Sequence, residues 1–211
     1  MFENCLAEPA LKLIDIFNDE LTRLNFYLAS GGGLALQLGH RRSEDLDFFT
    51  PEKFLPGELA HYLGGKFHYR ENHISAGTLY CEINAIKVSF IHYPVPLTLP
   101  LLKLKKISVA DWRDIMAEKF KTLSQRGSRK DFYDIYACFV IKQLTIEQGV
   151  GFLKNRFAGT DINYYHILKS LVYFEDADKE PEIATLLPFN WNEVKGFFIK
   201  NIPEFEKYLL T

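Results

Sequence analysis

Cysteine is scarce in this sequence of 211 residues, and it is not arranged for a disulfide framework or a metal site. Cys5, Cys81 and Cys138 are odd in number, lie far apart and include no C-x-x-C pair. Small secreted domains carry paired cysteines, whereas free thiols are typical of a reducing compartment. We therefore predict a cytoplasmic protein whose cysteines are free thiols.

Long apolar runs are also missing. No stretch reaches the length of about eighteen apolar residues that a membrane-spanning helix requires. The N-terminal residues 1–17, MFENCLAEPALKLIDIF, place acidic residues before the apolar part and contain no basic segment, so they do not resemble a secretory signal. No association with a membrane is expected.

A general excess of positive charge is absent as well. The formal net charge is −2, which argues against a protein that binds nucleic acid over its whole surface. The charge is uneven, however, because residues 119–130, KFKTLSQRGSRK, contain five basic residues and no acidic one. Such a segment could attract phosphates, although on charge alone a solvated surface is the simpler interpretation.

The pattern of apolar residues, which together with Ala, Tyr and Cys make up 47% of the chain, changes near residue 105. The segments before it predict an α/β half with helices over 9–24, 34–41 and 57–65, strands over 26–30 and 46–50, and a hairpin of 78–84 with 86–93. The segments after it predict helices over 112–126 and 129–144 and further helix starts at Thr145 and Asn190. We therefore predict an α+β protein with an α/β domain over 1–105 and an all-helical domain over 106–211.

The segment from Ser30 to Thr50, SGGGLALQLGHRRSEDLDFFT, contains the most informative motif. Its glycines follow a predicted strand and open a helix, where backbone N–H groups and the helix dipole can hold an anion. Asp45 and Asp47 are two residues apart on the returning strand, so their carboxylates face the same side. Mg²⁺ is bound by such carboxylates together with substrate phosphates. This convergence suits phosphoryl or nucleotidyl transfer, since both depend on positioning and charge stabilisation.

From these residues alone, an interpretation in which the motif has only a structural role is equally admissible. The glycines do not match the dinucleotide fingerprint, because Leu36 stands where Gly or Ala is required, and they are not followed by the Gly-Lys-Ser/Thr of a phosphate loop. A tight strand–helix turn followed by a surface Asp-x-Asp pair would leave the same pattern.

The motif GGGLALQLGHRRSEDLDFF (31–49), followed by MAEKFKTLSQRGSRKDFYDIY (116–136), resembles the AbiEii/AbiGii toxin family. This group lies within the minimal nucleotidyltransferase superfamily, which has a DNA polymerase β-like fold. The tail YFEDADKEP (173–181) is also similar, so the resemblance covers nearly the whole chain. It implies a nucleotidyltransferase-like first half with a small mixed sheet, and a helical half that completes the active-site cleft.

The resemblance also implies an activity and its partners. A nucleoside monophosphate would move from a nucleoside triphosphate to an acceptor hydroxyl on tRNA, protein or a small molecule. The protein would be the toxin of a type IV toxin–antitoxin or abortive-infection pair, with a cognate antitoxin as partner. The site residues that the family pattern assigns are Gly31, Gly32 and Gly33 for the triphosphate, Asp45 and Asp47 for Mg²⁺, Lys119 and Arg126 for the nucleotide, and Asp134 for the acceptor. Further candidates for acceptor contacts are Arg41, Arg42, Arg129 and Asp131.

One departure from the family pattern concerns a third carboxylate, expected on a later strand. Ser89 stands at the matching position in IKVSFI, and serine is a poor Mg²⁺ ligand and no general base by itself. Glu82, on the neighbouring strand, would substitute only if its side chain faced the site. Two other hypotheses therefore stay open: a catalytically silent nucleotide- or partner-binding protein on the same scaffold, and a transferase that modifies small molecules, as in antibiotic resistance.

Overall fold

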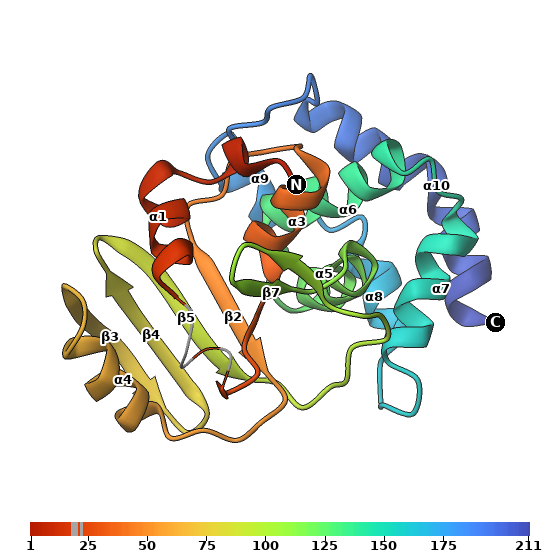
Figure 1. The fold of residues 1–211 in the computed structure, drawn as a ribbon. Coiled ribbons are helices and arrows are strands. Elements are labelled where there is room, and N and C mark those ends of the chain that lie inside the picture. The colour runs from red at the N-terminus through yellow and green to blue at the C-terminus, as the bar shows by residue number, and fades with distance from the viewer. Residues whose placement is uncertain (18–20, 22) are drawn as a thin grey trace. The chain divides into compact units, whose positions relative to one another are not determined.

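The computed structural model describes residues 1–17, 21 and 23–211 (Figure 1). The chain divides into two compact units, Met1–Asp111 and Trp112–Thr211. The first unit holds the sheet, and the second consists of helices. The predicted α+β fold class, with a mixed sheet followed by a helical half, is confirmed.

Among the described residues of the first unit, seven strands form one sheet in the order β3-β4-β5-β2-β1-β7-β6. Their bounds are β1 Tyr27–Leu28, β2 Leu46–Thr50, β3 Tyr69–Ser75, β4 Thr78–Ile83, β5 Ile86–His92, β6 Leu102–Leu104 and β7 Ile107–Val109. The sheet is mixed, because β2 runs parallel to β5 and β1 runs parallel to β7, while the other pairs are antiparallel. The predicted hairpin is β4–β5, and the predicted strand 46–50 is β2.

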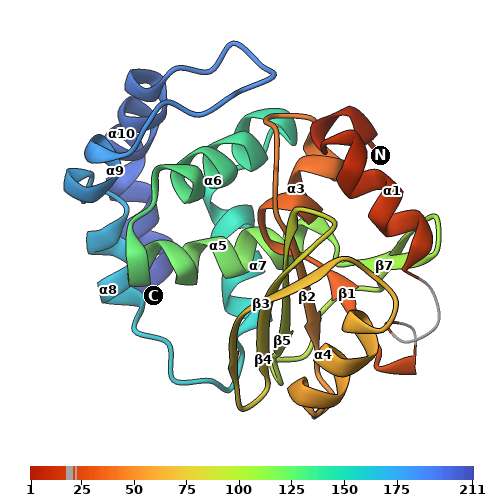
Figure 2. The same cartoon turned by 90° about the vertical axis from the view of Figure 1, so that its left-hand side faces the viewer.

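The helices of the first unit are a 3₁₀ turn Glu3–Cys5, α1 Glu8–Ile16, α3 Ser30–Leu38 and α4 Pro56–Gly64. Apolar side chains of α1 and α4 pack with one face of the sheet in a single core, and Figure 2 shows both helices on the same side of it. Phe48 of β2 and Phe90 of β5 stack at the centre of this core with ring centroids 5.6 Å apart. Because side chains alternate along a strand, Asp47 and Ser89 lie on the opposite face.

Three predicted helices differ in extent from the observed ones, and one of them, predicted over 129–144, is observed over Arg129–Ile141. The helix predicted over 9–24 is observed as α1 up to Ile16, and residues 18–20 and 22 lie outside the described part of the chain. The helix predicted over 34–41 begins earlier, at Ser30, and ends at Leu38, because Gly39 adopts a left-handed φ of 69° that stops it.

The second unit contains α5 Trp112–Arg126, α6 Arg129–Ile141, α7 Ile146–Arg156, α8 Tyr164–Ser170, α9 Glu175–Lys179 and α10 Trp191–Leu210. Both predicted helix starts are confirmed, and each is a capping box: Thr145 pairs with Gln148 before α7, and Asn190 pairs with Glu193 before α10. Fully buried phenylalanines such as Phe120 form the core of this unit. No helix in the described residues is long and apolar enough to cross a membrane.

Candidate active site

The glycine turn and the Asp-x-Asp motif lie side by side in the first unit. Strand β1 pairs antiparallel with β2, and directly after it the N–H of Ala29 donates a hydrogen bond of 3.0 Å to the carbonyl of Asp47. Helix α3 begins at the next residue, Ser30. The N-terminus of a helix is therefore fixed next to β2, which contains Asp47 and directly follows Asp45.

This N-terminus has the geometry of an anion site. The first helical hydrogen bond of α3 runs from the N–H of Gly33 to the carbonyl of Ala29 at 3.0 Å. The amides of Ser30, Gly31 and Gly32 precede that bond, and such leading amides are the ones that bind anions at helix ends. The Gly33 amide is already used within the helix, so it fits the predicted phosphate contact less well than Ser30. Sequence reasoning missed Ser30, whose φ of 55° is unusual for a residue with a side chain.

The glycines also allow α3 to approach its neighbours closely. A Cβ atom on Gly32 would come within 3.1 Å of the backbone carbonyl oxygen of Asp45, and one on Gly31 would collide with the guanidinium of Arg41. Backbone cannot move aside as readily as a flexible side chain. Gly32 is thus needed to bring the start of α3 against the segment that carries Asp45.

The two aspartates lie on the face of the sheet that points away from the core. Asp45 directly precedes β2 and Asp47 lies within it, and both are half-buried, while Leu46 and Phe48 between and after them are fully buried. Two half-buried carboxylates on one face supply the oxygen ligands that Mg²⁺ takes in proteins. Asp45 and Asp47 are therefore chemically suited to hold this ion.

Ser89 occupies the position next to Asp47 on the neighbouring strand. In the parallel register of β2 with β5, Asp47 and Ser89 are direct partners. Glu82 of β4 is the partner of Lys87, so it lies two strands from β2, and it forms an ion pair with Arg70 of β3. The described residues contain no group of three or more His, Cys, Asp or Glu side chains placed to hold a metal ion.

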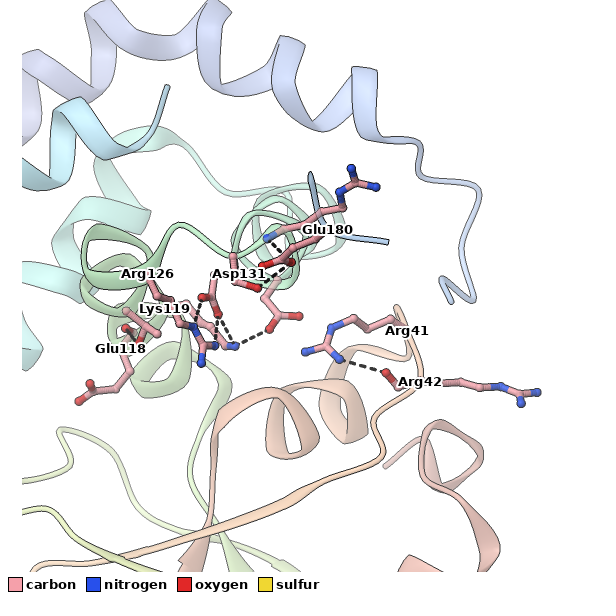
Figure 3. A network of polar contacts seen from close by, with 11 residues as sticks. Arg41, Arg42, Glu118, Lys119, Arg126, Asp131 and Glu180 are labelled. Carbon is pink, nitrogen blue, oxygen red and sulfur yellow. Dashed lines mark hydrogen bonds and ion pairs between the residues drawn. The ribbon is translucent and has the colours of Figure 1, made fainter. Parts of the chain in front are cut away.

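Arg41 and Arg42 differ in exposure. Arg41 is only 3% exposed, and its Nη1 donates a 3.0 Å hydrogen bond to the carbonyl of Arg42, as Figure 3 shows. The side chain of Arg42 is exposed. Of these two predicted acceptor contacts, Arg42 is the one presented to solvent, whereas Arg41 supports the turn after α3.

Four predicted site residues of the second unit form one ionic cluster (Figure 3). The Nζ of Lys119 lies 2.8 Å from Oδ1 of Asp131 and 2.7 Å from Oδ2 of Asp134. Arg126 donates two hydrogen bonds to the carboxylate of Asp131, from Nε at 2.7 Å and from Nη2 at 2.9 Å. Lys119, Asp131 and Asp134 are buried, so the cluster links α5 to α6 inside the unit.

Electrostatics explain how a carboxylate stays charged in this place. Burial by itself would raise the pKa of Asp131, but attraction by Lys119 and the bonds from Arg126 outweigh it and hold that pKa below its usual value. The carboxylate is therefore ionised throughout the neutral range, and it pins the ammonium of Lys119 in one position.

Arg129 has a different environment. Its Nε donates to the carbonyl of Ala177 at 2.8 Å and its Nη2 to the carbonyl of Asp178 at 3.1 Å, near the C-terminal end of α9. Its backbone N–H is bound by Glu180 at 2.9 Å. Because the side chain is buried and holds α9 in place, we count Arg129 as part of the scaffold and not among the acceptor contacts. These partners are about fifty residues away in sequence, so no local pattern could have revealed them.

Comparison with known proteins relates this chain to others of the same architecture. The uncharacterized protein aq_aa25 of Aquifex aeolicus (strain VF5) is 35% identical over 185 residues, which are 86% of this chain and 88% of that protein. The chain belongs to the family of aq_aa25. No family model matches its sequence.

Two solved structures from Helicobacter pylori resemble this member of the aq_aa25 family. JHP933 aligns with a TM-score of 0.57 and 15% identity over 97% of this chain and 94% of its own. A "putative nucleotidyltransferase" aligns with a TM-score of 0.54 and 15% identity over 96% of this chain and 97% of its own. At this level of identity the likeness shows the fold alone: a nucleotidyltransferase-like fold over nearly the whole chain.

Proposed function

We propose that this protein is a Mg²⁺-dependent nucleotidyltransferase. The observation that carries the proposal is the hydrogen bond from Ala29 to Asp47, which sets an anion-binding helix end beside two carboxylates on a nucleotidyltransferase-like fold. An acceptor hydroxyl attacks the α-phosphorus of a nucleoside triphosphate and forms a new O–P bond. The bond from the α-phosphorus to the bridging oxygen breaks, pyrophosphate leaves with the electron pair, and the hydroxyl proton passes to water.

The first unit supplies the binding groups for the triphosphate. The amides of Ser30, Gly31 and Gly32 donate to phosphate oxygens, and Asp45 and Asp47 hold the metal. Bound there, Mg²⁺ supplies positive charge that offsets the charge developing on the phosphates. Arg42 is the exposed cation that we assign to the acceptor.

The contact of Lys119 with the nucleotide phosphates, which the family resemblance implies, stays a prediction. Within the second unit its two carboxylate partners fix the direction of the buried ammonium. Asp131 and Asp134 then act through Lys119 as positioning residues. Arg126, whose side chain is 56% exposed, joins the same cluster from the outside.

The resemblance to AbiEii/AbiGii toxins extends the proposal to a biological role. We propose that the protein is the toxin of a type IV toxin–antitoxin or abortive-infection pair and that tRNA, a protein or a small molecule receives the nucleotide. Its expression would then inhibit growth, and a cognate antitoxin would relieve the inhibition.

A labelling experiment tests this function. Each of the four ribonucleoside triphosphates is supplied with ³²P at the α-phosphate, and transfer of the label to an acceptor is measured. The protein is incubated with Mg²⁺, total tRNA and cell lysate, and compared with the double variant Asp45→Ala, Asp47→Ala. We expect label on one class of acceptor with the wild type and none with the variant. Labelling or growth inhibition undiminished in the double variant would overturn the assignment of the aspartates.

Ser89 favours a second candidate function. Because a hydroxyl stands where the superfamily places a third carboxylate, the scaffold could bind a nucleotide without turning it over. That candidate predicts measurable binding of Mg²⁺ and nucleotide with no labelled product from any triphosphate.

A further inference from the structure

The face of the sheet that carries Asp47 continues across three more strands. Asp47 of β2 is the partner of Ser89 on β5, Ser89 is the partner of Tyr80 on β4, and Tyr80 is the partner of His73 on β3. Direct partners in neighbouring strands project from the same face. These four side chains therefore form one row that runs from the aspartate to the edge of the sheet.

The far end of this row is an aromatic pair. The rings of His73 and Tyr80 stack with centroids 6.0 Å apart and an angle of 29° between their planes. Tyr80 is 42% exposed and His73 is exposed as well. Exposed aromatic rings on a sheet surface are the feature on which single-stranded nucleic acids stack their bases.

The position of the pair suits an acceptor better than the triphosphate. Helix α3 follows β1, which adjoins β2 on one side, and its N-terminal amides lie there. Tyr80 lies on the other side of β2, two strands away, which corresponds to about 10 Å between the backbones of Asp47 and Tyr80. An acceptor that approaches Asp47 from this side would pass over Ser89 and reach Tyr80 within one or two nucleotides.

In the neighbouring row, Lys87 of β5 is the cation placed to meet a phosphate-bearing ligand. Lys87 of β5 is exposed and is the direct strand partner of Glu82 on β4. Glu82 is in turn the strand partner of Arg70 on β3, and these two side chains form an ion pair. Over β3, β4 and β5 this row contributes two cations and one anion beside the aromatic pair, and Asp45 lies on the same face at its β2 end. A nucleotide combines the planar ring and the negative phosphate that the two rows match.

We propose that Tyr80 and His73 form a stacking site for a base of a single-stranded RNA acceptor, with Lys87 contacting its backbone. This proposal rests on the proposed function, because it names the class of acceptor and the surface that positions it next to Asp47. It adds a binding surface on β3, β4 and β5 that neither the glycine turn nor the Asp-x-Asp motif contains.

Binding of RNA without turnover tests the proposal. The full chain is titrated into a fluorescently labelled single-stranded RNA of mixed sequence and about ten nucleotides, and the dissociation constant is read from anisotropy. Tyr80→Thr keeps a residue suited to a strand but removes the ring, and we expect it to weaken binding by about tenfold. Tyr80→Phe keeps the ring and should bind like the wild type. Tyr165→Ala removes a tyrosine that is 55% exposed on α8 and should change nothing.

Two parallel measurements separate this proposal from the function on which it rests. Affinity for Mg²⁺ with a non-hydrolysable ATP analogue should be the same in Tyr80→Thr and wild type, and Asp47→Asn should lose nucleotide transfer but keep RNA binding. Wild-type affinity for RNA in a folded Tyr80→Thr, or no RNA binding by the wild type, would overturn the stacking site even if transfer is observed. RNA binding that depends on Tyr80, without transfer to any acceptor, would support the stacking site and contradict the proposed function.

Discussion

At the scale of single residues, Ser89 is the side chain that most directly limits the proposed metal chemistry. It is the strand partner of Asp47, and its hydroxyl is a weaker Mg²⁺ ligand than a carboxylate. We predict that Ser89→Asp lowers the Mg²⁺ concentration needed for half-maximal transfer or nucleotide binding, because a third carboxylate then faces the ion. Titration of Mg²⁺ with the wild type and the variant measures the shift.

The neutral variant Ser89→Asn serves as the control for this experiment. It has nearly the same size as the aspartate but adds no charge, so it should not strengthen the response to Mg²⁺. An unchanged Mg²⁺ dependence in a folded Ser89→Asp would show that β5 does not face the metal.

Asp131 provides a prediction about stability. Replacing it with asparagine leaves the charges of Lys119 and Arg126 without one of their partners inside the unit, and we expect a loss of about 3 kcal/mol in the free energy of unfolding. Urea denaturation measures this loss. The matched control is Asp176→Asn, which removes the same charge from an exposed pair with Lys179 and should cost less than about 1 kcal/mol.

The contribution of Asp131 also depends on pH. Its pKa is lowered in the folded protein, so the unfolded chain takes up the proton first as the pH falls. The stabilisation is complete above the unfolded pKa of about 3.9 and is lost as the pH drops through the lower, folded pKa. The difference in stability between the wild type and Asp131→Asn should therefore be constant at neutral pH and shrink below about pH 4. A difference that grew on acidification would contradict this account.

At the scale of elements, the junction of α3 with the segment that carries Asp45 requires a glycine. We predict that Gly32→Ala lowers transfer activity by about tenfold or more, because the new Cβ pushes on the backbone of Asp45 and displaces a carboxylate. Steady-state transfer rates and the affinity for Mg²⁺ with nucleotide measure the effect.

Gly151→Ala is the matched control for this substitution. Nothing lies within 4 Å of a Cβ at Gly151 in α7, so the change should leave activity intact and stabilise the protein by about 0.5–1 kcal/mol. Equal activity of Gly32→Ala and the wild type would show that the close approach has no role in the site.

Helix α7 offers a second prediction at this scale. Thr145 accepts a hydrogen bond from the backbone N–H of Gln148, whose side chain binds the N–H of Thr145 in return. Thr145→Ala should cost about 1 kcal/mol of unfolding free energy in thermal or urea denaturation. Thr122→Ala in the middle of α5, where the hydroxyl only bonds back to Glu118, should cost less. The reverse order would contradict a stabilising capping box.

Elements with a strong local pattern could be predicted from sequence, and those without it could not. Helix α5 and strand β2 have the predicted bounds, because a glycine or proline ends each of them and their apolar periodicity is clear. Strand β3 was missed because it is an edge strand whose residues are almost all exposed. Strands β6 and β7 were missed because each is only three residues long, with Lys103 inside β6 and Lys105 and Lys106 between the two strands.

At the scale of the whole molecule, the order of strands was beyond the reach of sequence patterns. Pairing of β1 with β7 joins residues about eighty positions apart, and no local signal encodes such a contact. For the same reason, sequence patterns could not predict the row from Asp47 to His73, because its members come from four separate strands. Asp45 and Asp47 are candidates from a short motif and Lys119 is a candidate from the family resemblance, whereas the amide of Ser30 and the scaffold role of Arg129 depend on tertiary contacts.

The account as a whole depends on nucleotidyl transfer, in which the α-phosphate moves and pyrophosphate leaves. The most direct test runs two reactions in parallel with the same triphosphate, one labelled with ³²P at the α-phosphate and one at the γ-phosphate, with Mg²⁺ and cell lysate. We predict that the α-label appears on an acceptor while the γ-label is released as pyrophosphate, and that Asp47→Asn abolishes both. Transfer of the γ-label to an acceptor, or products that persist in Asp47→Asn, would contradict it.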